Sequence, residues 1–301
     1  MARQNFGGDW TEDKLSRVGE YLKKYNVALK NQRFSREYID AFAGTGYREV
    51  RDEGGHDGLM FPELAEPEVQ RFLDGSARIA LKVEPYFHKF TFIEKNPSKV
   101  EELRKLQQEY PDKTIRIECG DANDWVQSIC REDWNYRRAV LFLDPFGMQV
   151  SWQTLEAVAR TKCIDVWLLF PLGVSISRLL KRDGDIDEVL CKRLDFVFGD
   201  RSWRETFYKT TPPNPPKAVQ QSLFGSEDGD PESEQPWKAD FSVIEDYFRA
   251  RLRTIFAKVA DNSVRLKNSK NVPLYLLFFM AANERGAPIA VKIAESIMGR
   301  P

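Results

Sequence analysis

The chain has 301 residues, of which 42% are hydrophobic, 12% aromatic and 30% charged. This composition is typical of a folded protein and excludes a disordered chain, while the length allows one large domain or two of ordinary size. Lysine and arginine number 45 and the acidic residues 46, so the formal net charge is −1. A protein with a uniformly basic surface is therefore excluded, although a local basic patch is not.

Cysteine and histidine are scarce. The four cysteines lie far apart without a Cys-x-x-Cys pair, and there are only two histidines. We therefore expect neither a metal site nor a disulfide framework. No apolar run reaches the ~20 residues that a bilayer requires, and the first ten residues contain no apolar signal core. These features favour a cytoplasmic protein that does not contact a membrane.

The first third of the chain predicts two helices around a strand. Apolar residues at three- and four-residue spacings predict a helix from about Thr11 to Leu29, and residues 37–43 form a short apolar strand that ends in Gly44-Thr-Gly46. Residues 47–75 are polar and rich in glycine, which predicts a loop insertion. Ser76 is predicted to cap a short helix that reaches residue 83.

Strands and helices then alternate. The strands are nearly continuous in apolar residues, and such runs separated by helices predict a parallel sheet of an α/β fold covered on both faces. The predicted strands are 90–94, 114–118, 139–144 and 164–170, and the helices between them are 97–110, 124–131 and 152–160.

The last third is less regular. Residues 174–208 are predicted to be helical, and residues 210–240, rich in proline and acidic residues, are predicted to be a flexible segment. A helix from Phe241 to about Ala257 follows. Two further strands are predicted to form a hairpin before a final helix that begins near residue 289. These strands are 258–266 and 274–280.

In an open parallel sheet, ligands bind beyond the carboxyl ends of the strands. The first strand ends with Asp40, followed by Gly44 and Gly46, glycines that suit a sharp turn close to a ligand. A dinucleotide fingerprint would place a third glycine at the position of Glu49, so a pyrophosphate ligand is disfavoured. A plain turn between strand and loop remains an equal reading of the two glycines.

The next two strand ends each carry an acid. Glu94 is placed to accept hydrogen bonds from ribose hydroxyls, or it is a solvated side chain at a strand end. Asp121 is placed to accept from an adenine amino group, or it caps the helix that follows. Both readings stay open for each residue.

The fourth strand end is the most informative. Asp144-Pro145-Phe146-Gly147 follows a buried strand directly. A carboxylate there is costly unless something binds it, and the neighbouring aromatic ring offers a stacking surface.

In this order the four strand ends resemble those of class I S-adenosylmethionine-dependent methyltransferases, over about residues 36–173 with 264–282 as the hairpin. The resemblance implies a Rossmann-like, mostly parallel seven-stranded sheet with helices on both faces and a C-terminal antiparallel β-hairpin. It also implies an N-terminal helical extension, residues 1–35, and a methyltransferase-like domain, residues 36–301, with insertions at 47–75, 174–208 and 210–240.

A closer resemblance is to the three-Cys-motif partner family of bacteria. It rests on five segments of the chain, and it implies a separate cysteine-motif protein as a partner. The segments are Trp10-Thr11, residues 38–44, Gly75-Ser76, residues 92–94 and residues 144–147.

The motif at residues 144–147 is similar to Asp/Asn-Pro-Pro-Tyr/Phe of the amino methyltransferases that act on adenine or cytosine. It is closer to Asp-Pro-Phe-Gly of the tRNA guanine N2-dimethyltransferases. The resemblance therefore implies an RNA or DNA substrate, which is methylated on an exocyclic base amine.

The resemblance also implies roles for individual residues. Asp144 and the Pro145 carbonyl would accept the hydrogens of the target amine, with Phe146 stacking on the base and Gly147 completing the catalytic motif. For S-adenosylmethionine, Asp40 would hold the amino end of the cofactor, and Gly44 and Gly46 would lie close to its methionine part. Glu94 would bind the ribose and Asp121 the adenine. The neighbouring residues of the implied cofactor site are Phe42, Lys95 and Ala122.

Basic residues on two helices are either phosphate contacts or a solvated charged face, and the interleaved acids favour the latter. Two other functions compete with methylation of nucleic acid: a cofactor-binding or degenerate partner subunit without transfer activity, and a methyltransferase of small molecules or proteins. The basic residues are Lys14, Arg17, Lys23, Lys24, Lys30, Arg249, Arg251 and Arg253.

Overall fold

A computed structural model of the chain describes residues 9–45, 75–180, 186–209, 237–268 and 270–300. The predicted loop insertion, apart from Gly75, and the first 27 residues of the predicted flexible segment, 210–236, lie outside these residues, as does Gly46.

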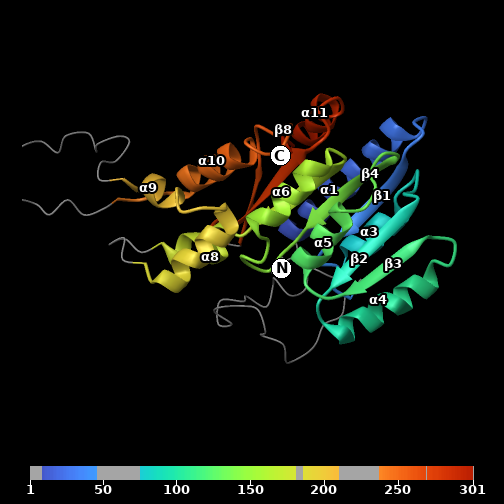
Figure 1. Cartoon of the computed structure of the whole chain (residues 1–301), viewed down its shortest axis with the longest axis horizontal. Helices are drawn as coiled ribbons and strands as arrows, with labels where there is room; N and C mark the ends of the chain where they lie inside the picture. Colours follow the sequence, from blue (N-terminus) through green and yellow to red (C-terminus); the bar gives the residue numbers. More distant parts are fainter. Residues whose placement is uncertain (1–8, 46–74, 181–185, 210–236, 269, 301) are drawn as a thin grey trace, which may run out of the picture.

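One mixed sheet runs through the molecule (Figure 1). Its parallel part has the strand order β3-β2-β1-β4-β5, so β1 and β4 lie side by side at its centre. This order places the switch point of the sheet between β1 and β4, where a ligand is expected. The five strands are β1 (Ser35–Asp40), β2 (Lys89–Glu94), β3 (Ile115–Cys119), β4 (Arg137–Leu143) and β5 (Ile164–Phe170).

Antiparallel strands complete the sheet beyond β5. β10 (Pro273–Ala281) pairs with β5, and β9 (Val264–Lys267) pairs with β10 as a hairpin. The predicted Rossmann-like sheet with its C-terminal antiparallel hairpin is confirmed. The sheet has eight strands rather than seven, because the predicted strand 258–266 divides into β8 (Lys258–Val259) and β9, each pairing with β10.

Helices cover both faces of the sheet (Figure 1). Side chains of one face pack with α5 (Ala122–Cys130), α6 (Trp152–Thr161), α8 (Glu188–Phe198) and α10 (Phe241–Leu252). The opposite face packs against four other helices, so that two hydrophobic cores enclose the sheet. These are α1 (Asp9–Leu29), α3 (Ser76–Lys82), α4 (Pro97–Glu109) and α11 (Ala287–Met298).

The first helix is part of this cover. Tyr21 and Leu22 of α1 are fully buried in the same core as the strands. The Arg17 guanidinium donates to the carbonyls of Ile297 and Met298 at 2.6 and 3.1 Å, where α11 ends. A cation at the end of a helix satisfies carbonyls that have no partner within the helix. Arg17 therefore fastens α1 to α11 and does not face a nucleic-acid backbone.

The described part of the predicted helical region 174–208 contains four separate helical elements. They are the π-helix η2 (Leu172–Ile176), α7 (Ser177–Leu179), α8 and α9 (Trp203–Phe207). α8, α9 and α10 extend to the left of the view in Figure 1. Among the helices of the described residues, none combines the length and apolar character that a membrane crossing requires.

The last four residues of the predicted flexible segment lie within the described residues and include a strand. β7 (Trp237–Lys238) pairs with β6 (Tyr208–Lys209), and the Asp240 side chain accepts hydrogen bonds from the backbone amides of Ser242 and Val243 at the start of α10. The prediction of a flexible segment up to residue 240 is therefore wrong for its last four residues.

A buried carboxyl at the start of β5 gives a pH-dependent stability. Tyr21 Oη donates to Asp165 Oδ2 at 3.0 Å. Burial raises the pKa of Asp165 to about 7, although the Tyr21 hydrogen bond opposes the rise. The unfolded chain loses this proton near pH 4. Between about pH 4 and 7 the native state holds a proton that the unfolded state has lost, so its free energy of unfolding falls as the pH rises.

Between pH 5 and pH 7.5, the free energy of unfolding of wild type should fall as the pH rises. In Asp165→Asn, which mimics the protonated carboxyl, we expect this fall to be smaller, by at most about 1.4 kcal/mol per pH unit. Urea unfolding at both pH values measures this difference. Asp112→Asn is the control, because Asp112 is exposed. Equal slopes for wild type and Asp165→Asn would contradict the expectation.

Candidate active site at the carboxyl edge of the sheet

The carboxyl ends of four parallel strands bring most of the predicted site residues to one edge. In the register of the sheet, Asp40 at the end of β1 lies beside Phe92 of β2 and Phe142 of β4. Glu94 ends β2, and Asp144 directly follows β4. The acids of β1, β2 and β4 are therefore neighbours across the centre of the sheet.

The turn after β1 is clamped to the end of β2. Gly44 has a φ of 61°, a left-handed conformation that favours glycine. Its amide donates to Glu94 Oε2 at 3.1 Å, and the amide of Asn96 donates to Glu94 Oε1 at 2.8 Å. Because a carboxylate oxygen has two lone pairs, each oxygen of Glu94 can accept one more hydrogen bond. Glu94 is half-buried and Lys95 beside it is exposed.

Asp40 is fully buried behind this turn. The Phe42 amide donates to its Oδ1 at 3.2 Å and Tyr38 Oη to its Oδ2 at 3.3 Å. Burial raises the pKa of Asp40 to about 7, and the negative charge of Asp144 adds to the rise, whereas hydrogen bonds from Ser76, Phe42 and Tyr38 oppose it. The first strand therefore ends in a carboxyl that the protein itself already engages.

Ser76 does not have the role that its position predicted. The N-cap of α3 is Gly75, without a side-chain capping bond. Ser76 is buried and hydrogen-bonds Asp40 instead. The prediction that Ser76 caps the helix is wrong, because the helix begins one residue earlier and turns this side chain toward the strand end.

Asp121 caps α5, one of its two open readings. Its Oδ1 accepts from the Asn123 amide at 2.9 Å and from Asn123 Nδ2 at 3.1 Å. No described residue donates to Oδ2. Ala122 is the first residue of α5 and is nearly buried. An N-cap with one unused oxygen still leaves an acceptor at the edge of the sheet.

Asp144 is held by a cation from the first helix. Lys14 Nζ lies 2.6 Å from Asp144 Oδ2, and each side chain is only 2% exposed. The ammonium also lies 5.7 Å from the centre of the Phe142 ring. Lys14 is therefore not the phosphate contact or solvated cation that its charge predicted. Its spacing gives the signal, since it precedes the buried Val18 by four residues and Tyr21 by seven.

Helix α5 and strand β10 fix the loop that follows Asp144. Gln149 Oε1 accepts from the Phe146 amide at 3.2 Å, and Asn123 Nδ2 of α5 donates to the Gln149 carbonyl at 2.8 Å. Tyr275 Oη donates to the Phe146 carbonyl at 3.4 Å. The ring of Phe146 is half-buried, with Lys99 Nζ of α4 5.6 Å from its centre. The ring is thus held beside the strand ends with a cation over one face.

Pro145 and Gly147 are buried in the same loop. A cavity of about 10 Å³ lies beneath them, lined by apolar side chains that include Leu168 and Phe170. This volume is about that of one water molecule. No described residue donates a hydrogen bond to the Pro145 carbonyl.

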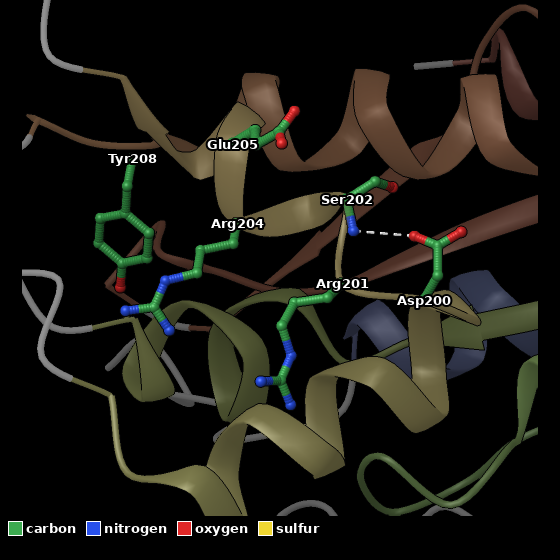
Figure 2. Close-up of a pocket in the computed structure, with 6 residues that line it drawn as sticks. All are labelled: Asp200, Arg201, Ser202, Arg204, Glu205 and Tyr208. Carbon is green, nitrogen blue, oxygen red and sulfur yellow. Dashed lines mark hydrogen bonds between the residues drawn. The ribbon is translucent and has the colours of Figure 1, made fainter.

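A larger hollow of about 610 Å³ lies far along the chain from these strand ends, where α8 meets α9 (Figure 2). One of its cations, Arg201, pairs with Glu188 and Asp195 of α8. The hollow contains none of the predicted site residues. Its lining is Asp200, Arg201, Ser202, Arg204, Glu205 and Tyr208.

The cations of the late helix are also engaged. Arg249 pairs with Glu245, Arg251 with Asp200, and Arg253 with Asp261. These ion pairs favour the reading of a charged protein surface over that of a phosphate-binding patch. On α1, Lys24 pairs with Glu20, whereas Lys23 and Lys30 are exposed.

No protein-family model and no curated protein matches the chain. Among solved structures, protein LPL1258 from Legionella pneumophila, described with the family model DUF519, is 11% identical, with 98% of this chain and 92% of that chain covered and a TM-score of 0.50. An S-adenosylmethionine-dependent methyltransferase from Clostridium acetobutylicum is 10% identical, with 89% and 91% covered and a TM-score of 0.37. TehB from Haemophilus influenzae is 11% identical, with 88% and 65% covered and a TM-score of 0.33.

At these identities the likeness shows the fold alone, and TM-scores of 0.37 and 0.33 carry no argument. The mostly parallel sheet and the antiparallel strands beyond β5 are those that the resemblance of the sequence implied. The chain therefore has a Rossmann-like α/β fold, in which antiparallel strands complete a parallel sheet.

Proposed function

We propose that this chain is an S-adenosylmethionine-dependent methyltransferase that methylates an exocyclic amine of a nucleic-acid base. The observation that carries the proposal is the hydrogen bond from the Gly44 amide to Glu94, which joins the ends of β1 and β2 next to Asp144. It creates a turn without a side chain beside a carboxylate that has spare lone pairs. A ligand that consists of a nucleoside and a flexible amino-acid tail can lie close to such a turn.

The residues at the edge fit S-adenosylmethionine. Among the described residues, only one hydrogen bond reaches each oxygen of Glu94 and none reaches Asp121 Oδ2, so these oxygens suit the two ribose hydroxyls and an adenine amino group. A side chain at position 44 would stand where the backbone turns with a positive φ. Asp40 supports the turn from behind, through the Phe42 amide.

S-adenosylmethionine, when bound, supplies an electrophilic methyl group. The part of the protein in such a transfer is mainly to align the acceptor and exclude water. Asp144 Oδ1 and the Pro145 carbonyl are two hydrogen-bond acceptors, the number that an exocyclic NH₂ group requires, and together they would orient the nitrogen lone pair. Neither has to remove a proton before transfer. The half-buried ring of Phe146 is the surface on which the base would stack.

The substrate and partner follow from the same motif. A base within a duplex would have to be flipped out to reach these acceptors, and Lys99 of α4 places a cation over the ring of Phe146. We place the chain in the three-Cys-motif partner family as part of the proposal, with a separate cysteine-motif protein as its partner. Its resemblance rests on the segments described above, four of which lie at or beside this edge.

Calorimetric titration with S-adenosylmethionine and S-adenosylhomocysteine tests the cofactor. We expect micromolar binding to wild type and loss of at least 100-fold in affinity in Glu94→Ala and Gly44→Asp, because the first removes the ribose acceptor and the second fills the turn. Glu101→Ala is the control, since Glu101 is an exposed residue of the neighbouring helix α4.

Transfer of a radiolabelled methyl group to RNA and DNA, at several salt concentrations, tests the substrate. Binding of the cofactor without transfer to either nucleic acid would favour the alternative function, a cofactor-binding subunit without activity of its own. Wild type that folds but binds neither compound would refute the proposal.

A further inference from the structure

We propose that Lys14 determines which amines the site accepts: by neutralising Asp144, it selects an uncharged aromatic amine and excludes an alkylammonium group. The inference rests on the proposed function in one respect, namely that Asp144 faces the amine that is methylated. It names the chemical class of the substrate at that site and a residue that decides it.

Among the described residues, Lys14 contacts only one of the two oxygens of Asp144. Lys14 Nζ lies 2.6 Å from Asp144 Oδ2, and no described residue donates to Oδ1. Both side chains are 2% exposed, so water screens neither charge well. A ligand that reaches Oδ1 therefore meets a carboxylate whose negative charge is already balanced by the ammonium group of Lys14.

Such a site treats two kinds of amine differently. An exocyclic base amine is uncharged, so it needs only hydrogen-bond acceptors, and the Lys14 charge does not oppose it. A lysine side chain or a polyamine is a cation at neutral pH, and at Oδ1 it would lie within a few ångströms of the Lys14 ammonium. At low effective dielectric this repulsion is strong, and it cancels the attraction to Asp144.

Proton removal gives a second reason. An alkylammonium has no free lone pair for methylation until it loses a proton. Of the carboxyls at the ends of β1 and β4, Asp144 is paired with Lys14, and Asp40 is fully buried with both oxygens engaged by Phe42 and Tyr38. Neither is an open proton acceptor. An aromatic amine offers its nitrogen without this step.

Anchoring of α1 does not explain the pair. Arg17 already fastens the helix to α11, and Tyr21 fastens it to β5 through Asp165. Burying two charges is costly, and a hydrophobic pair of the same size is often at least as stabilising. A lysine that reaches the end of β4 from another element therefore points to a function at that strand end.

The experiment compares the affinities of wild type and Lys14→Met for two probes, by calorimetric or NMR titration with and without S-adenosylhomocysteine. Butylammonium mimics a lysine side chain, and adenosine carries a neutral aromatic amine. We expect butylammonium to bind at least tenfold more tightly to Lys14→Met than to wild type, and adenosine to change less than twofold. A structural tie alone would not produce this selective change.

Two variants serve as controls. Lys23→Met removes an exposed lysine of the same helix, and should leave both affinities unchanged. The double variant Lys14→Met/Asp144→Asn should return the affinity for butylammonium to the wild-type level, because it removes both charges. If Lys14→Met does not fold, Lys14→Gln, which retains a donor to Asp144, gives the same comparison.

Unchanged butylammonium affinity in a folded Lys14 variant overturns the inference, as does an equal gain for both probes. The proposed function fails separately: wild type that does not bind S-adenosylhomocysteine refutes the cofactor, while the titrations without it still show whether Lys14 excludes cations.

Discussion

Asp144→Ala is expected to lower the free energy of unfolding by about 3–5 kcal/mol, because it removes the carboxylate that balances the buried ammonium charge of Lys14. Both side chains of the pair are only 2% exposed, and the two atoms are 2.6 Å apart. The Lys14 ammonium can regain water only if the N-terminal part of α1 moves away from the sheet. Urea or thermal unfolding measures the change.

An exposed pair of similar geometry is the matched control. Lys162 Nζ and Glu284 Oε1 lie 2.8 Å apart, but both side chains are about two-thirds exposed. Glu284→Ala should therefore change stability little. A loss in Asp144→Ala no greater than that in Glu284→Ala would contradict the account of a buried, mutually dependent pair.

The same variant separates substrate binding from cofactor binding. Under the proposed function, Asp144→Ala should abolish methyl transfer and leave the affinity for S-adenosylhomocysteine within twofold of wild type, provided that both are measured at a temperature where the variant is folded. Equal loss of both would show that Asp144 belongs to the cofactor site and not to that of the amine.

Gly173→Ala is expected to lower the free energy of unfolding by about 3 kcal/mol or more, beyond the usual cost of an added methyl group in a packed core. Gly173 lies in η2, directly after β5. A Cβ there would stand 2.0 Å from the carbonyl oxygen of Pro273 and 3.3 Å from Leu274 Cα. Both are backbone atoms of β10, which pairs with β5 and β9 and so cannot shift without breaking the sheet.

Gly147→Ala is the matched control for stability. Its Cβ would stand 3.4 Å from the nearest atom, the Oγ of Ser175, which is an ordinary contact with a small side chain. We expect a cost well below that of Gly173→Ala in thermal unfolding. Similar losses for the two variants would mean that the close approach of η2 to β10 is not what Gly173 provides.

Much of the fold could be predicted from the sequence because buried parallel strands consist of consecutive apolar residues. β5, for example, has the predicted bounds Ile164–Phe170. The helix α10 shows where the pattern misleads: it ends at Leu252, five residues before the prediction. Phe256 is 4% exposed and continues the apolar spacing from a turn. Spacing reports which side chains are buried, and not whether the backbone is still helical.

The candidate site could likewise be predicted only in part. Glu94 and Asp144 could be predicted, since they lie at strand ends and the end of a strand can be recognised in the sequence. The partner of Asp144 could not be found, because it lies 130 residues away on another element. Periodicity places Lys14 on the buried side of α1 but does not say which acid it meets. The hydrogen bond from Ser76 to Asp40 could not be predicted either. The start of the helix was predicted one residue late, which gave Ser76 the role of a cap.

The contacts of α1 have a consequence for synthesis of the protein. The polar groups that receive Lys14, Tyr21 and Arg17 follow them in the chain by 130, 144 and 280 residues. Since ribosomes add roughly 5–20 residues per second, the buried face of α1 must wait on the order of 15–60 s for its last partners at the end of α11. During that time its apolar stripe, with Tyr21 and Leu22, is open to chaperones. Although α1 precedes the other described helices in the chain, it is thus among the last to complete its packing.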